Sequence, residues 1–151
     1  MFENFKSILV TTDFSESGDH AVLHAFRMAA DHSAEVVLCH VVEPIVVANP
    51  LYLQYYPGDL LSPEVRQRAE ADAHVALAAL VPKDGPLTNV KHRTLVAHGS
   101  PAEEIIRVAE QQHIDLIVIA THGHTGLKHL FMGSVAERVI RHAHCPVLVV
   151  R

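Results

Sequence analysis

The sequence predicts an α/β fold in which a five-stranded parallel sheet lies between two layers of helices. Short β-branched apolar segments alternate with segments that carry apolar residues at helical spacing, and this alternation runs through the whole chain. The connections between parallel strands are then right-handed crossovers, which place helices on both faces of the sheet. With 151 residues the chain has the length of one domain with a substantial core, so residues 1–151 are expected to form a single domain.

The first half of the chain contains two predicted strands, one predicted helix and one irregular segment. Residues 6–12 and 34–42 are predicted strands because apolar and β-branched side chains dominate them. Residues 15–30 are predicted to be a helix. Its core-facing residues are Ala21, Val22, Ala25, Met28 and Ala29. Residues 43–61 contain Pro44, Pro50, Pro57 and Gly58 together with all 3 tyrosines of the chain, which indicates a long loop.

The second half repeats the alternation with clearer helix starts. Ser62-Pro63 and Ser100-Pro101 each begin a predicted helix, because serine caps helix N-termini and proline suits the first helical position. Ser100 and Glu103 have the spacing of a capping box. The remaining predicted elements are strands at 92–97, 114–120 and 146–150 and a helix at 134–142. The residues expected to face the core from the three helices are Val65, Ala69, Ala73, Ala76, Leu77 and Leu80, then Ile105, Ile106 and Ala109, then Val135, Val139 and Ile140. Polar residues 91–93 place the strand at 92–97 near a sheet edge.

Composition and charge narrow the class of protein. The net charge of −5 argues against a nucleic-acid surface, which needs a basic patch. No run approaches the roughly 20 apolar residues of a membrane span. The first residues lack the basic and apolar segments of a secretory signal, so a cytoplasmic location is expected. Cys39 and Cys145 lie in separate apolar stretches and are expected to be reduced, buried thiols.

Residues 114–134 carry the most informative pattern. The apolar segment 114–120 is followed by Gly123 and Gly126, and Gly133-Ser134 then opens a helix. Glycines let backbone N–H groups approach a phosphate, and the dipole of the following helix favours negative charge, so this segment predicts an anion site. Its spacing is not that of a Walker loop or of a dinucleotide fingerprint.

This segment resembles the nucleotide loop of the universal stress protein family, written G-x2-G-x9-G-S/T. Gly123, the nine residues 124–132 and Gly133-Ser134 fit that pattern, whereas Ala120 stands where the first glycine is usual. The resemblance extends over the whole chain. It includes Ile8-Leu9-Val10 before Asp13-Phe14-Ser15, His40-Val41-Val42, residues 99–105 and the C-terminal segment 133–150.

The family resemblance implies a strand order of 3-2-1-4-5, as in adenine nucleotide alpha hydrolase-like and Rossmann-like folds. Strands one and four are then neighbours at the topological switch point, where ligands of open α/β sheets bind. The resemblance implies ATP there, with Mg²⁺ carried by the phosphates near Asp13, and with Val41 against the adenine. The implied ATP-binding residues are Thr12, Asp13, Val41, Ala120, Thr121, His122, Gly123, Gly126, Gly133, Ser134 and Val135.

Several of these residues have simpler alternative roles. Asp13 has the residue type of a helix N-cap, and Ser134 with Glu137 has the spacing of a capping box. In the simpler alternative, Gly126 only relieves strain in a turn, and Lys128 is a solvent-exposed loop residue. The 13 histidines suggest a metal, but no group of them supplies the three or four converging ligands of a zinc site, so none is expected. No serine lies in the G-x-S-x-G turn that carries the nucleophile of a hydrolase, which argues against a nucleophilic enzyme. Residues 97–99 lack the phosphorylatable aspartate that a response-regulator receiver domain has after its third strand, which argues against that class.

The sequence therefore favours a universal stress protein that binds ATP and acts as a regulator rather than an enzyme. The alternatives are a slow ATP hydrolase or nucleotidyl-transfer enzyme on the same fold, and a nucleotide-free protein-interaction module. Residues 43–61 are expected to form a flap over the nucleotide, a partner surface or a plain connector. The apolar residues 146–150 are expected to form an edge strand that pairs with its own copy in a homodimer, as the family resemblance also implies.

Overall fold

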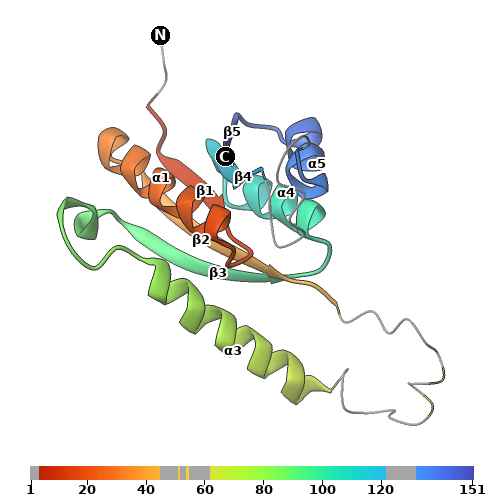
Figure 1. The fold of residues 1–151 in the computed structure, drawn as a ribbon. Helices are drawn as coiled ribbons and strands as arrows, with labels where there is room; N and C mark the ends of the chain where they lie inside the picture. The colour runs from red at the N-terminus through yellow and green to blue at the C-terminus, as the bar shows by residue number, and fades with distance from the viewer. Residues whose placement is uncertain (1–3, 45–50, 52–53, 55–61, 122–131) are drawn as a thin grey trace.

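The five strands form one parallel sheet in the order β3-β2-β1-β4-β5. This computed structural model describes residues 4–44, 51, 54, 62–121 and 132–151 (Figure 1). The strands are β1 (Ser7–Thr11), β2 (Glu35–Val42), β3 (His92–His98), β4 (Leu116–Ala120) and β5 (Val147–Val150). The predicted fold class and strand order are confirmed.

β1 lies at the centre of the sheet and joins its two halves. Ile8 pairs with Val36 of β2 on one side and with Leu116 of β4 on the other. Ile8, Leu9 and Val10 have no exposed surface, as expected for a parallel strand covered on both faces. The strand order reverses between β1 and β4, so the switch point of the sheet lies at their carboxyl ends.

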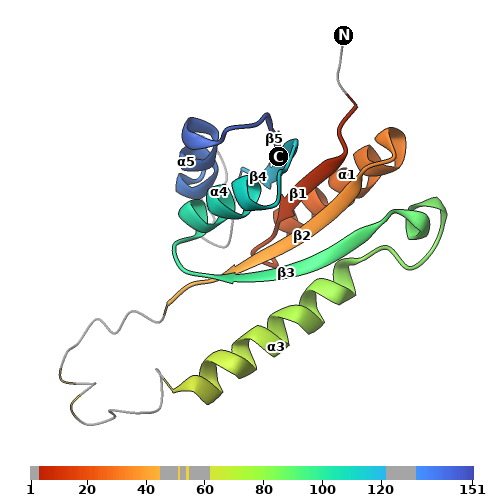
Figure 2. The same cartoon turned by 180° about the vertical axis from the view of Figure 1, so that it is seen from behind.

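Helices cover both faces of the sheet, and each face has its own core. Because side chains alternate along a strand, Val10 packs toward α1 (Glu16–His32) and α3 (Pro63–Leu80), whereas Leu9 packs toward α4 (Pro101–Gln111) and α5 (Ser134–His142). Figures 1 and 2 show α4 and α5 side by side and α3 alongside β3. Phe26 of α1 is fully buried in the first core, although its position was not among the predicted core residues.

Two element boundaries differ from the prediction by two residues, and one element was not predicted. α1 continues to His32 and ends at Ser33, which adopts a left-handed conformation with φ 55°. β4 begins at Leu116 rather than at residue 114. A short 3-10 helix, η1 (Pro86–Asn89), precedes β3 and was not predicted. The edge position predicted for residues 92–97 is confirmed, because β3 ends the sheet.

Serine capping was predicted correctly at one helix and wrongly at two. The Ser62 hydroxyl accepts a hydrogen bond from the backbone N–H of Val65, 3.3 Å away. Ser100 makes no such bond at the start of α4, so the capping box there was wrong. Ser134 is the first residue inside α5, one position too far along the chain to cap it, because Gly133 is the N-cap.

Two burial predictions were also wrong. Ile140 is 41% exposed, whereas Ala136 and Val139 turn to the core. α5 packs mainly against α4 at the end of the sheet, which leaves the flank that carries Ile140 uncovered. Cys39 is buried as expected, but Cys145 lies in a bend before β5 and is only partly buried.

No helix within the described part of the chain is long and apolar enough to cross a membrane.

Candidate functional site

A cavity of about 560 Å³ lies at the carboxyl ends of β1, β2 and β4, at the switch point of the sheet. Its size falls in the range of small-molecule and cofactor pockets. The residues that line it are Thr11, Thr12, Asp13, Gly18, His40, Val41, Glu43, Ser100, Pro101, Ala102, Ile105, Ile119, Ala120, Thr121, Gly133, Ser134, Val135, Ala136 and Arg138. The position of the cavity is the one that open α/β sheets use for ligands.

The cavity brings together the predicted site residues that the structure describes. Thr12 and Asp13 follow β1, Val41 lies near the end of β2, and Ala120 and Thr121 lie at the end of β4. Gly133, Ser134 and Val135 complete the set at the start of α5. His122, Gly123, Gly126 and Lys128 lie outside the described residues.

The loop between β1 and α1 is held by its own side chains. The Asp13 carboxylate accepts hydrogen bonds from the backbone N–H and the hydroxyl of Ser15. The Ser15 hydroxyl in turn accepts from the N–H of Gly18 and caps α1. Asp13 is therefore not the N-cap of this helix; it fixes the residue that is.

Phe14 gives this loop an unusual backbone conformation. Its φ of 64° lies in the left-handed region, which bulky side chains rarely adopt. The backbone N–H of Phe14 donates to the Thr12 hydroxyl at 2.9 Å, and its ring packs against the His40 ring with centroids 4.4 Å apart. Strained residues of this kind persist where the surroundings fix them, often beside functional sites.

His40 holds the same loop from β2. Its Nδ1 lies 2.8 Å from the carbonyl oxygen of Thr12. A carbonyl only accepts hydrogen bonds, so Nδ1 carries a proton and donates it. His40 thereby ties the end of β2 to the residue that precedes Asp13.

Two helices begin at the cavity wall. The first residues of α4 and of α5 both line it, so unpaired backbone N–H groups and the positive ends of two helix dipoles lie close to its interior. Such an arrangement favours an anionic group on this side of the cavity. Asp13 and Glu43 place negative charge at the ends of β1 and β2 instead.

Sequence reasoning missed five cavity residues that carry polar or charged side chains. They are Thr11, His40, Glu43, Ser100 and Arg138. His40 and Glu43 flank the predicted stretch at the end of β2, and Arg138 follows Ser134 by four residues, one helical turn along the same face. Helical spacing could therefore have indicated Arg138 from the sequence.

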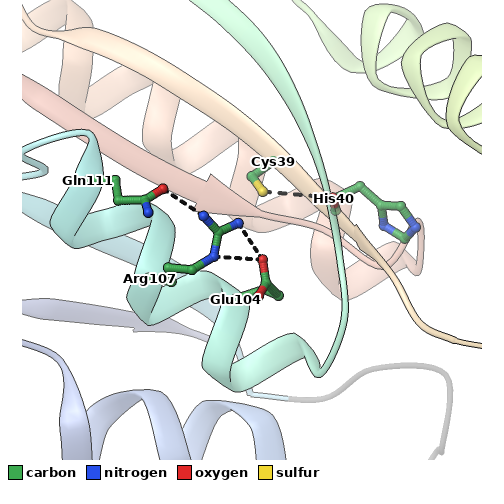
Figure 3. A network of polar contacts seen from close by, with 5 residues as sticks. All are labelled: Cys39, His40, Glu104, Arg107 and Gln111. Carbon is green, nitrogen blue, oxygen red and sulfur yellow. Dashed lines mark hydrogen bonds and ion pairs between the residues drawn. The ribbon is translucent and has the colours of Figure 1, made fainter.

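The two cysteines do not offer a nucleophile. Burial raises the pKa of the Cys39 thiol to about 12, and the nearby Glu104 carboxylate adds to the effect. Figure 3 shows Cys39 on β2 and, on the neighbouring helix α4, Arg107 donating to Glu104 and to Gln111. Burial also raises the pKa of the Cys145 thiol. Both thiols stay protonated at neutral pH, and neither lines the cavity.

Within the described residues no group of three or more histidine, cysteine, aspartate or glutamate side chains is placed to hold a metal ion.

An open parallel α/β sheet with a cavity at its switch point defines a class of ligand-binding proteins. Within this class, the sequence model of the universal stress protein family matches residues 4–151. The chain belongs to the universal stress protein family.

Individual relatives and solved structures agree with this assignment. The chain is 38% identical over 149 residues to universal stress protein MJ0531 of Methanocaldococcus jannaschii, which covers 97% of this chain and 82% of the relative. The structure of protein MJ0577 from the same organism superposes with a TM-score of 0.78 at 30% identity, covering 98% and 96% of the two chains. Universal stress protein UspA of Lactobacillus plantarum gives a TM-score of 0.72 at 25% identity, covering 99% and 100%.

Two more distant structures of this fold contain nucleotides. A universal stress protein solved in complex with cAMP gives a TM-score of 0.63 at 22% identity, covering 99% of this chain and 98% of its own. One from Archaeoglobus fulgidus, solved in complex with dAMP, gives 0.62 at 18% identity and covers 99% and 100%. At these identities the likeness to this chain concerns the fold.

Proposed function

We propose that this protein binds ATP in the cavity at the switch point of the sheet and acts as a nucleotide-dependent regulator in a stress response. The observation that carries the proposal is the meeting of eight sequence-predicted nucleotide residues, from four segments of the chain, on the wall of one cavity of about 560 Å³. The complexes of two family members with cAMP and dAMP support an adenine nucleotide as the ligand class.

The distribution of charge in the cavity suits a nucleotide in one orientation. The backbone N–H groups at the start of α5 would hold phosphate oxygens. The Asp13 carboxylate and the end of β2 at Val41 would face the ribose and the base. Mg²⁺ carried by the phosphates would neutralise part of their charge. Of the two cavity carboxylates, Asp13 and Glu43, we assign the water shell of the ion to Asp13, which follows β1.

Mass spectrometry of small molecules released from the gently desalted protein, together with calorimetric titration of ATP, tests this function. We expect one ATP per chain and no sustained hydrolysis. Continuous turnover of ATP would instead support the slow hydrolase or nucleotidyl-transfer enzyme. Absence of binding would support the nucleotide-free interaction module, for which Ala120 in place of the usual glycine is the sequence argument.

Replacement of Gly123 by valine tests the segment that lies outside the described residues. A branched side chain would fill the space proposed for the phosphates, so binding should be lost while the fold remains.

Residues 43–61, which also lie mostly outside the described part, are proposed to cover the nucleotide or to meet a partner. Hydrogen exchange over residues 51–57 that does not change on addition of ATP would exclude the cover.

We further propose that the regulator is a homodimer paired through β5, in the cytoplasm. β5 forms one edge of the sheet, and three of its four side chains, those of Val147, Leu148 and Val149, are only partly buried. An apolar edge strand presents unpaired backbone groups to another chain. Sedimentation that finds a monomer at micromolar concentration would exclude this dimer.

A further inference from the structure

Arg138 stands out in the cavity because of its charge and its partner. Among the described residues that line the cavity it is the one permanently cationic side chain, whereas Asp13 and Glu43 are anionic. Its guanidinium Nη2 donates to the Glu103 carboxylate of α4 across 2.9 Å. The ion pair thus spans the two helices whose first turns form one wall of the cavity.

The position of Arg138 on α5 brings its charge toward the phosphate side of the cavity. It lies one turn after Ser134, on the same face of the helix. Side chains on a helix lean toward its N-terminus, and Arg138 lines the cavity together with Ser134 and Val135 of the first turn of α5. This turn also supplies the backbone N–H groups that favour an anion.

The ion pair with Glu103 is one that can be exchanged at small cost. The Arg138 and Glu103 side chains are 55% and 61% exposed, and ion pairs at such exposure contribute little to stability. Glu103 lies in the first turn of α4, where the helix dipole stabilises a carboxylate without a further partner. A phosphate group carries more charge than a carboxylate and offers a guanidinium the same paired geometry.

We infer that Arg138 leaves Glu103 for a terminal phosphate of the bound nucleotide and so makes the site select nucleotides by their number of phosphates. The inference rests on the proposed function and adds a specificity residue to it. Arg138 then adds nothing to the affinity for adenosine, which has no phosphate. Each phosphate beyond the first brings negative charge closer to the guanidinium and so increases the affinity. Glu103 acts against binding, because it competes with the phosphates for the same cation.

Calorimetric titrations of adenosine, AMP, ADP and ATP at one ionic strength test this inference. Arg138→Gln should weaken ATP binding roughly three- to tenfold, the range expected for one exposed charge-assisted contact, and should leave adenosine binding unchanged. Glu103→Gln should strengthen ATP binding up to about threefold, because Arg138 then has no partner to leave.

Arg141→Gln is the matched control. It removes the same charge from the same helix, and Arg141 pairs with Glu137 at 2.7 Å, but Arg141 does not line the cavity. Equal losses of ATP affinity in Arg138→Gln and Arg141→Gln would overturn the inference, since only the overall charge would then matter. An equal loss of adenosine and ATP affinity in Arg138→Gln would also overturn it, because a structural defect would explain both. If the parent protein binds ATP with no dependence on phosphate number, only this inference fails; if the parent binds no adenine nucleotide, the proposed function fails with it.

Discussion

The backbone N–H of Gly133 donates a hydrogen bond to the carbonyl oxygen of Thr121 across 2.7 Å. The two residues flank the segment 122–132, which contains most of the predicted phosphate loop, so this bond joins the two stems of the loop. Thr121 is itself anchored, because its N–H donates to the carbonyl oxygen of Val150 at 2.9 Å. The beginning and end of the loop are therefore fixed to each other and to β5.

Gly133→Ala should weaken ATP binding by roughly tenfold, since misplacement of a binding group by a fraction of an ångström has large effects. A Cβ atom on Gly133 would lie 2.9 Å from the Thr121 carbonyl oxygen, which is too close, so the stems must separate. Calorimetric titration with ATP measures the effect.

Gly85→Ala is the control for this variant. Gly85 has a left-handed φ of 77° at the start of η1, and a Cβ there meets nothing within 4 Å. It should lose about 1 kcal/mol of unfolding free energy through backbone strain and retain full ATP affinity. Undiminished ATP binding by Gly133→Ala would show that the stem contact does not shape the site.

Ser62→Ala should lower the free energy of unfolding by about 1 kcal/mol, whereas Ser100→Ala should change it by only a few tenths. Both serines precede a proline at the first position of a helix, so the sequence context is matched. Only the Ser62 hydroxyl accepts a bond from the helix backbone, that of Val65. Urea unfolding of the two variants measures the difference, and equal losses would contradict the capping assignment.

Cys39 should make the protein less stable as the pH rises from about 9 to about 12. Burial raises the pKa of its thiol from 9.0 to about 12, so in this interval the unfolded chain has lost the thiol proton while the folded chain retains it. Deprotonation then favours unfolding, and the full stability is present below pH 9. The loss is about 1 kcal/mol for each pH unit, the free energy of one pKa unit.

The pH slope of the unfolding free energy in Cys39→Ala isolates the contribution of this thiol. The slope should be smaller in this variant than in the parent. Cys145→Ala, which removes a less buried thiol, should retain most of the parental slope. Identical slopes in the parent and in Cys39→Ala would contradict the role of Cys39.

The strands were predictable because strong local signals mark them, whereas the set of site residues stays a prediction. Unbroken apolar segments mark β1, β2 and β4, and the small residues after β4 predict an anion-binding segment. The sheet order came from the family resemblance, since periodicity does not show which strands are neighbours. Where the prediction failed, the deciding factor is either the local backbone geometry or a contact between distant segments. Ser100 and Ser62 look alike in sequence, and only the local backbone determines which one caps its helix.

The missed cavity residues illustrate the same limit. His40 reaches the site through a bond to the Thr12 carbonyl, 28 positions away in the sequence. Arg138 pairs with Glu103 across 35 positions. A single sequence gives the residue types but not these pairings, which follow from the packing of α4 against α5 and of β2 against β1.

The central pairing of β1 with β4 has a consequence for folding. Among the described strands it is the one ladder that connects the first three strands of the chain to the last two, and it pairs Ile8 with Leu116. Closing so long a stretch of chain is entropically costly, so we expect this contact to form late and to set the folding rate. The cavity takes its walls from both groups of strands and exists only after they dock. A bound nucleotide would therefore stabilise only the state in which the two groups of strands have docked. Increasing the nucleotide concentration should then slow the separation of the two halves of the sheet.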